Sequence, residues 1–236
     1  MSTFSRRTAI WNGVKRISPF MVIAGPFGLI YGVTAADAEV GNLAAISASF
    51  IMLGGAAQIA LMELIRDDAT PLVAIATALV INLRFGLYSA SLARPFAAFP
   101  RRFRFPFAAI LSDQAAIVAI NEYETEHDPH YRAWFYLGAA GIFLVPWWIG
   151  TVIGVLVGGD IGDAWQLPFA VPCTFLSLLV PSIRTRPALV AAVVGGGAAV
   201  GLSFLPSGVN IILGAFAGIA AGTIVSPLPS GEAATT

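Results

Sequence analysis

Residues 80–95 read VINLRFGLYSASLARP, and this stretch decides how the rest of the chain must be understood. Hydrocarbon side chains fill most of it, yet Asn82 and Arg84 lie in its middle and Tyr88 follows one helical turn after Arg84. A continuous helix from Pro71 would carry Arg84 about 20 Å along its axis. An arginine at the centre of a membrane helix costs about 2.5–3.5 kcal/mol on insertion scales. We therefore expect its side chain to face protein or water and not lipid.

The composition of the chain indicates an integral membrane protein. Of 236 residues, 57% are hydrophobic and only 11% are charged, whereas a soluble domain carries about 25% charged residues. The 13 basic and 13 acidic residues cancel, which argues against nucleic acid as a partner because that role needs a basic excess. Cys173 is the single cysteine, so no disulfide can form within the chain.

The apolar segments predict an all-α polytopic fold with six to eight transmembrane helices. A bilayer core needs about 20 apolar residues of helix. Segments near that length, separated by short polar connections, are 17–36, 43–65, 71–93, 105–121, 133–157, 166–182, 187–205 and 209–226.

The N-terminal run is too long for a cleavable signal and is expected to be a retained first helix. The predicted organisation is a cytoplasmic N-terminal segment at 1–16, a single transmembrane transport domain at 17–226 and a disordered tail at 227–236. Basic loop residues favour cytoplasmic N- and C-termini. With eight full spans, however, the basic cluster RPFAAFPRRFR, at 94–104, would lie outside the cell, contrary to this rule. The conflict disappears if 71–93 and 105–121 are broken or re-entrant, so that the loop between them stays on the cytoplasmic side.

Asp113, near the middle of segment 105–121, is the natural counter-charge for Arg84. Two opposite charges attract strongly where the dielectric constant is low, and each is costlier alone. The sequence leaves two alternatives open for each residue. Arg84 either snorkels or caps carbonyl groups, or it lines a pathway where it meets a carboxylate. Asp113 is either half of a structural ion pair or a site for protons or substrate.

Small residues beside polar ones mark further candidates for a binding site. The pair Gly54–Gly55 precedes Gln58, and Pro26 lies in AGPFGLIYG, at 24–32. Such patterns are typical of interrupted helices that expose backbone groups, from which transporters build sites near the bilayer midplane. Helix packing is the alternative reading for Gln58. It is the preferred reading for the glycines of GTVIGVLVGG, at 150–159, and GAFAGIAAG, at 214–222.

No catalytic signature occurs in the sequence. It contains no HExxH, no GxxxxGK[ST] and no GxSxG motif. His127 and His130 lie in a polar connection, where a solvated loop is expected and not a metal site. We therefore predict a protein that is not an enzyme and that has neither a cofactor nor a metal.

Several motifs together resemble one known family. INLRFGLYSASLA, at 81–93, is similar to the most specific segment of the AzlC family of branched-chain amino acid permeases. MLGGAAQIALMEL, PFGLIYG, LSDQAA and the run from WWIGTVIGVLVG to PFAVPCTFLSLLVP continue the likeness in order over nearly the whole chain.

This resemblance implies a bacterial inner-membrane transporter, often an exporter of valine and its relatives. It implies a small AzlD-like membrane protein as partner, with protons as a further candidate and a homo-oligomer as an open option. The polar positions of the family carry over to Gln58, Asn82, Arg84, Tyr88 and Asp113. Phe85 stands where a histidine is common, and Gln114 stands where a glutamate often follows the aspartate, so proton coupling here must differ or rest on Asp113 alone.

The leading hypothesis is a permease subunit that moves a valine-like zwitterion outward, linked to the proton-motive force. Arg84 would hold the carboxylate, and Asp113 would pair with Arg84 or with the substrate ammonium. Polar groups would be bound by Gln58, Asn82 and the backbone near Gly54, Gly55 or Pro26, and the side chain would be received by Phe27 and Phe85, with Tyr88 on the face of Arg84. The alternative is a non-transporting scaffold or assembly subunit for a small partner membrane protein.

Overall fold

The computed structural model describes residues 5–97, 99, 101–125, 128–161, 176, 179–180, 183–205 and 208–226. These residues form helices and contain no strand, as expected for an all-α membrane protein. Three described helices are long and apolar enough to cross a membrane: α1 (Arg6–Asp37), α4 (Pro71–Ala97) and α7 (Pro129–Ile161). With a rise of 1.5 Å per residue, each is about 40 Å long or longer, which exceeds the roughly 30 Å of a hydrocarbon core.

The other helices are shorter and occur in pairs. They are α2 (Asn42–Ile51) with α3 (Gly55–Arg66), α5 (Arg101–Ala109) with α6 (Asp113–Tyr123), and α9 (Arg186–Gly201) with α10 (Val209–Val225). The predicted segment 166–182 lies almost entirely outside the described residues, and the predicted tail 227–236 lies wholly outside them.

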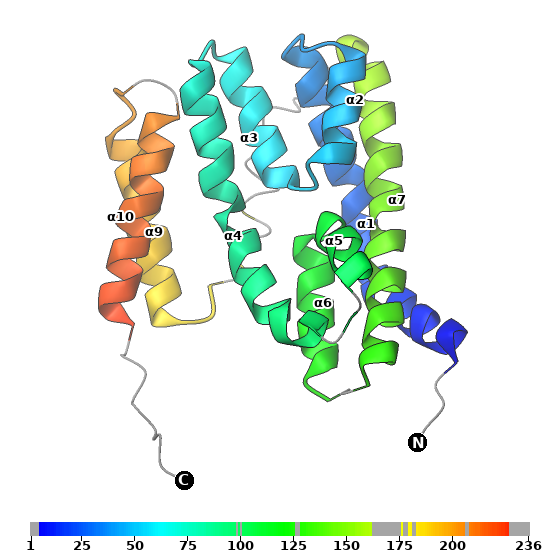
Figure 1. Cartoon of the computed structure of the whole chain (residues 1–236). Coiled ribbons are helices and arrows are strands. Elements are labelled where there is room, and N and C mark those ends of the chain that lie inside the picture. The colour runs from blue at the N-terminus through cyan, green and yellow to red at the C-terminus, as the bar shows by residue number, and fades with distance from the viewer. Residues whose placement is uncertain are drawn as a thin grey trace.

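The first pair forms a re-entrant hairpin. α1 rises from the lower end to the upper end of the bundle in Figure 1, α2 descends to the middle, and α3 returns to the upper end. Residues 52–54 between the two helices are not helical. α2 and α3 are only about 15 and 18 Å long, so each covers about half of a bilayer core. The predicted span 43–65 is therefore two half-length helices that turn back to the same side.

The second pair repeats this arrangement from the opposite end. α4 descends without interruption, α5 rises to the middle and α6 returns to the lower end, where α7 begins (Figure 1). The interruption at 110–112 confirms the broken helix expected in 105–121. The prediction of a broken or re-entrant 71–93 is wrong, because α4 is continuous. After Pro71, Gly86 is the only glycine or proline in its first 24 residues.

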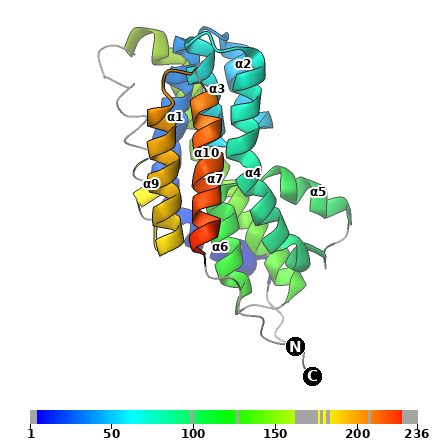
Figure 2. The same cartoon turned by 90° about the vertical axis from the view of Figure 1, so that its left-hand side faces the viewer.

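Glycines join α1 to α7, and these two helices form the most extensive contact in the described structure. A methyl group on Gly28 would meet the backbone of Trp147 and Thr151, and one on Gly154 would meet the backbone of Leu29 and Gly32. The close approach needs residues without a side chain, as is usual for packed membrane helices. Gly195, Gly214 and Gly218 join α9 to α10 in the same way. Figure 2 shows this last pair as an outer layer that faces the viewer beside α4.

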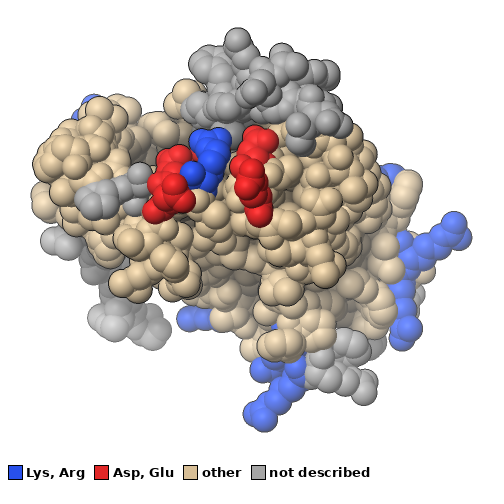
Figure 3. Space-filling model, turned by 90° about the horizontal axis from the view of Figure 1, so that it is seen from above, with Lys and Arg blue, Asp and Glu red and all other residues tan. Residues whose placement is uncertain are grey.

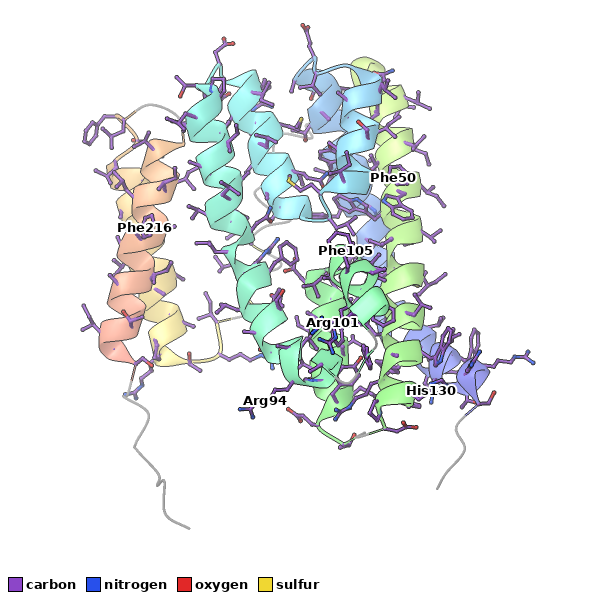
Figure 4. All side chains as sticks on the ribbon, viewed as in Figure 1. Phe50, Arg94, Arg101, Phe105, His130 and Phe216 are labelled. Carbon is purple, nitrogen blue, oxygen red and sulfur yellow. The ribbon has the colours of Figure 1, made fainter. Side chains whose placement is uncertain are left out.

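The two ends of the bundle carry opposite charge. Figure 3 looks down on the upper end, where acidic side chains surround a basic one; this end holds the α1–α2 and α3–α4 turns, with Glu39, Asp67, Asp68 and Arg66. The lower end holds the first turns of α1, α5 and α9 and the last turn of α4, and thus most of the described Lys and Arg residues; Figure 4 labels Arg94 and Arg101 there. The basic cluster at 94–104 is therefore at the same end as the start of α1, because α2–α3 does not cross.

We predict that Gly154→Ala destabilises the protein whereas Gly141→Ala, in the same helix, does not. The first methyl group would collide with the backbone of α1, and no described atom lies within 4 Å of the second. Overpacking of this kind costs about 1–3 kcal/mol, and alanine is otherwise the better helix former. Thermal unfolding of the two purified variants in detergent measures the difference. Equal melting temperatures would contradict the importance of this interface.

Candidate functional site

Arg84 and Asp113 form an ion pair in the middle of the bundle. Arg84 Nη2 of α4 lies 3.2 Å from Asp113 Oδ2 of α6. The two side chains are 31% and 25% exposed, so the pair is partly shielded from the surroundings. Arg84 Nε and Asp113 Oδ1 are both buried and make no hydrogen bond with any described group. The pair thus neutralises two charges but leaves polar capacity unused on each partner.

The interruption between α5 and α6 brings Asp113 to this position. Asp113 is the first residue of α6, and Ser112 caps the helix by accepting a hydrogen bond from the Ala115 amide at 3.3 Å. The N-terminus of a helix carries a partial positive charge that favours an anion. The carboxylate of Asp113 is therefore stabilised by the end of its own helix as well as by Arg84.

Tyr88 completes this cluster on α4. It lies one turn after Arg84, and its hydroxyl group is close enough to Asp113 to interact with the carboxylate. The rings of Phe85 and Tyr88 meet edge to face with centroids 6.1 Å apart. Arg84, Phe85 and Tyr88 thus form one surface of α4 that faces the interrupted helices.

The interruption between α2 and α3 meets the same part of α4. A methyl group on Gly54 would lie 2.5 Å from Asn82 Oδ1 and 3.3 Å from the ring of Phe85. One on Gly55 would lie 2.8 Å from the rings of both Phe27 and Trp147. A side chain at Gly55 would collide with two aromatic rings, whereas one at Gly54 would require the Asn82 side chain to move. The structure brings Gly54, Gly55, Asn82, Phe85 and Phe27 together; that they bind a substrate stays a prediction.

Gln58 is the most deeply buried polar side chain in this region. It lies in the first turns of α3 with 0% exposure, and neither its amide nitrogen nor its oxygen has a hydrogen-bond partner among the described residues. Asn82 Oδ1 is likewise buried without a partner in the described structure. A buried amide without partners costs about 1–3 kcal/mol. Two such groups beside one helix interruption leave hydrogen-bonding capacity available there.

Pro26 does not mark an interruption of the backbone. α1 is helical from Arg6 to Asp37 and continues through both Pro19 and Pro26. The residues that follow Pro26 belong to the glycine contact with α7, except for Phe27, which reaches Gly55. The expectation that Pro26 exposes backbone groups therefore has no support in the helix geometry.

Trp147, Ser49 and Thr151 are important residues that the sequence alone did not single out for the site. Trp147 is buried, and its Nε1 donates to Ser49 Oγ at 2.7 Å. Ser49 Oγ is in turn 3.1 Å from Thr151 Oγ1. Tryptophan in membrane proteins is enriched at the membrane interface; Trp147 lies instead in the interior, where it joins α2 to α7 and packs on Gly55. The sequence did carry one indication that Trp147 is buried: it follows Pro146 on the same helix as the glycines that pack against α1.

A pocket of about 230 Å³ opens between α4 and α5, on the lower side of the ion pair. Its wall includes Ser89, which follows Tyr88, and Leu111, which precedes Ser112. Arg104 lies at the wall as well, and its guanidinium donates to the carbonyl groups of Ala97 and Phe99 beyond the end of α4. The pocket thus lies between the basic end of the bundle and the ion pair.

Comparison with known proteins identifies the family. The profile of the family described as AzlC protein matches residues 19–161. The chain belongs to the AzlC family. The match runs from α1 to α7 and includes both re-entrant hairpins and the Arg84–Asp113 pair. It leaves out α9 and α10. The resemblance noted from the sequence is thereby confirmed.

A relative from Archaeoglobus fulgidus (strain ATCC 49558 / DSM 4304 / JCM 9628 / NBRC 100126 / VC-16), described as an uncharacterized membrane protein, is 30% identical over 237 residues. The alignment covers 98% of this AzlC-family chain and 98% of the relative. No solved structure matches the chain. The comparisons thus place this chain among membrane proteins of a family that is linked to branched-chain amino acid transport.

We predict that Asp113→Asn destabilises the protein more than the double change Arg84→Gln with Asp113→Asn. The single variant leaves the guanidinium without its counter-charge, whereas the double variant removes both charges. Breaking a fully buried pair costs roughly 3–5 kcal/mol, and we expect about 1–2 kcal/mol here because both side chains are partly exposed. A double-mutant cycle of thermal stabilities in detergent measures the coupling. Strictly additive effects would show that the pair contributes no coupling energy.

Proposed function

We propose that this protein is the transport subunit of a permease that moves branched-chain amino acids across the membrane. The observation that carries the proposal is the Arg84–Asp113 pair at the tip of a re-entrant helix, in a member of a family linked to this transport. Ionisable residues inside membrane proteins mark substrate or ion pathways by default. Discontinuous helices that meet near the midplane are the usual framework of a transporter site.

The charges of the pair are complementary to a zwitterion. A bound amino acid presents its carboxylate to Arg84 and its ammonium group to Asp113. Each charge of the pair then exchanges one partner for another, so the site stays neutral when it is empty and when it is occupied. The free N–H groups in the first turn of α3, at Gly55 and Ala56, add a second attraction for the carboxylate.

The neighbouring residues suit the remaining parts of the guest. Gln58 and Asn82 supply hydrogen bonds from buried groups that lack partners in the described structure. Phe27 and Phe85, which meet at the glycine pair, form an apolar surface for a branched side chain. A hydroxyl or charge on the substrate side chain would be poorly accommodated there, because a buried polar group needs its own partner.

Export linked to the proton-motive force is the mode of action that we assign to the site. Asp113 is the described carboxylate closest to the proposed path. In its ionised form it is the counter-charge, and in its protonated form it carries the proton. A small AzlD-like membrane protein is the proposed partner. We assign the basic lower end to the cytoplasm, because Lys and Arg are enriched in cytoplasmic loops. In this orientation the start of α1 and the end of α10 face the cytoplasmic side of a bacterial inner membrane.

We predict that Arg84→Gln abolishes export of labelled valine, whereas Arg94→Gln, at the lower end of the same helix, retains it. The first change removes the carboxylate partner and the second leaves the site intact. Proteoliposomes that contain the chain alone, or the chain with its AzlD-like partner, measure efflux of valine, leucine and isoleucine against lysine and glutamate. We expect at least a ten-fold loss for Arg84→Gln, corresponding to about 1.4 kcal/mol of binding energy.

The same assay separates transport from the scaffold alternative. A scaffold moves no amino acid with or without the partner, and its variants change only the amount of complex that can be purified. Wild-type efflux by a correctly inserted Arg84→Gln chain would exclude Arg84 from the mechanism.

We predict that Arg101→Cys reacts with an impermeant thiol reagent from the cytoplasmic side and that Asp68→Cys reacts from the opposite side. The two positions lie at opposite ends of the bundle. Labelling of intact cells and of inverted vesicles, in a Cys173→Ser background, gives the orientation directly. Labelling with the two sides exchanged would contradict the re-entrant path of α2–α3, and labelling of both positions from one side would contradict the crossing of α4.

A further inference from the structure

Identical residues recur in the chain at a constant offset. Phe27–Leu29 and Phe85–Leu87 both read FGL, with an offset of 58 (85 − 27 = 58). Without any gap, the same offset pairs further identical residues on either side of this run: Val22 with Val80, Ile23 with Ile81, Ala35 with Ala93, Leu53 with Leu111, Ala57 with Ala115 and Ile59 with Ile117. Residues 19–66 thus correspond to residues 77–124.

The topology shows the same relation independently of residue identity. Each stretch consists of a long helix followed by a re-entrant hairpin: α1 with α2–α3, and α4 with α5–α6. The non-helical turns at 52–54 and 110–112 lie at the same offset of 58. The two units run in opposite directions, because α1 rises and α4 descends (Figure 1). This is the arrangement of an inverted-topology repeat.

α7 contacts both hairpins at equivalent positions. Trp148 Nε1 donates to the carbonyl oxygen of Ser49 at 3.3 Å, and the Tyr136 hydroxyl donates to the carbonyl oxygen of Phe107 at 3.0 Å. Ser49 and Phe107 correspond at the repeat offset (107 − 49 = 58). Their side chains differ completely, so the backbone arrangement itself is what the two units share.

The two units differ in whether their long helix is closed against the first arm of the hairpin. Ala93 lines the pocket between α4 and α5, whereas its equivalent Ala35 is fully buried in the core between α1, α2 and α7. Ser89 lines the same pocket. Its equivalent Tyr31 is 0% exposed and donates to the carbonyl oxygen of Ala45 in α2 at 2.8 Å. The unit α4–α6 is therefore open between its long helix and its hairpin, whereas the unit α1–α3 is closed at the equivalent place.

We infer that residues 19–66 and 77–124 are inverted repeats whose hairpins gate one path alternately from the two sides of the membrane. The structure is the conformation that is open at the basic end, between α4 and α5. The opposite conformation exchanges the roles of the two units: α4 closes on α5, and α1 separates from α2 at the acidic end. The inference rests on the proposed transport function for its purpose, but the motion itself can be measured without any substrate.

The matched pair Ala93→Cys and Ala35→Cys tests this inference in a Cys173→Ser background. An impermeant maleimide is applied separately to either side of native membrane vesicles. We expect Ala93→Cys to react from the basic side and Ala35→Cys to react from the acidic side, more slowly because it is buried in this conformation. Tyr31→Phe, which removes the hydrogen bond between α1 and α2, should shift the ratio of the two rates about five-fold toward Ala35→Cys. Tyr123→Phe, which removes a bond to the Arg132 carbonyl at the lower end, should leave the ratio unchanged.

Reciprocal change of the two rates supports alternating gates. The inference is overturned if both rates rise together in Tyr31→Phe, or if both cysteines react from one side. If Ala35→Cys fails to insert, the less buried Ala38→Cys takes its place. Valine efflux measured on the same chains separates the two proposals. Reciprocal labelling without efflux of any amino acid retains the gates and rejects the substrate, and efflux without reciprocal labelling does the reverse.

Discussion

A positive charge inside hydrocarbon needs a negative partner, and this requirement organises the centre of the protein. Arg84 meets Asp113 at 3.2 Å because the second hairpin turns back at the depth of the guanidinium. If 105–121 were a continuous span, its carboxylate would lie along the side of a helix. The interruption instead places it in the first turn, where the helix end stabilises it. Charge neutralisation and backbone interruption are thus two aspects of one arrangement.

The glycines and the buried aromatic residues make that arrangement rigid. Gly28 and Gly154 allow α1 and α7 to touch through their backbones, and Gly54 and Gly55 allow the first hairpin to approach α4 and Trp147. Non-helical backbone is tolerated at membrane depth only where protein or water surrounds it. The hydrogen bonds from Trp147 and Trp148 to Ser49 hold the first hairpin beside α7, so that its tip remains enclosed.

The class of fold could be predicted from the sequence, and Asp113 could be named as the candidate counter-charge of Arg84, although not their contact. A low charge content indicates a lipid environment, and an isolated Arg and Asp in apolar segments stabilise each other there. The path of the chain could not be predicted. Hydropathy averaged over a window predicts 43–65 to be one span, since two half-length helices contain as many apolar residues as one long helix. Only the basic cluster at 94–104, on an apparently wrong side, indicated that one segment does not cross.

The proline and glycine signals were harder to interpret, because each has a meaning that depends on its neighbours. MLGGAAQ at 52–58 carries the glycines that interrupt a helix, whereas 71–93, which was expected to be broken, lacks such a pair and is continuous. Pro26 was expected to mark an interrupted helix, but α1 continues through it. Close packing against α7 holds that part of α1 helical, and this contact with a distant segment leaves no local trace in the sequence.

The half-length arms have an electrical consequence. Where a pocket on the lower side extends toward Arg84 and Asp113, the insulating layer around that pair is thinner than the bilayer itself. A membrane potential falls mainly across the insulating part of its path, which here is the closed half between the pair and the acidic end. Moving one elementary charge through 100 mV is worth about 2.3 kcal/mol. A displacement of the pair would therefore cross a larger share of the potential than the same displacement in an uninterrupted bilayer.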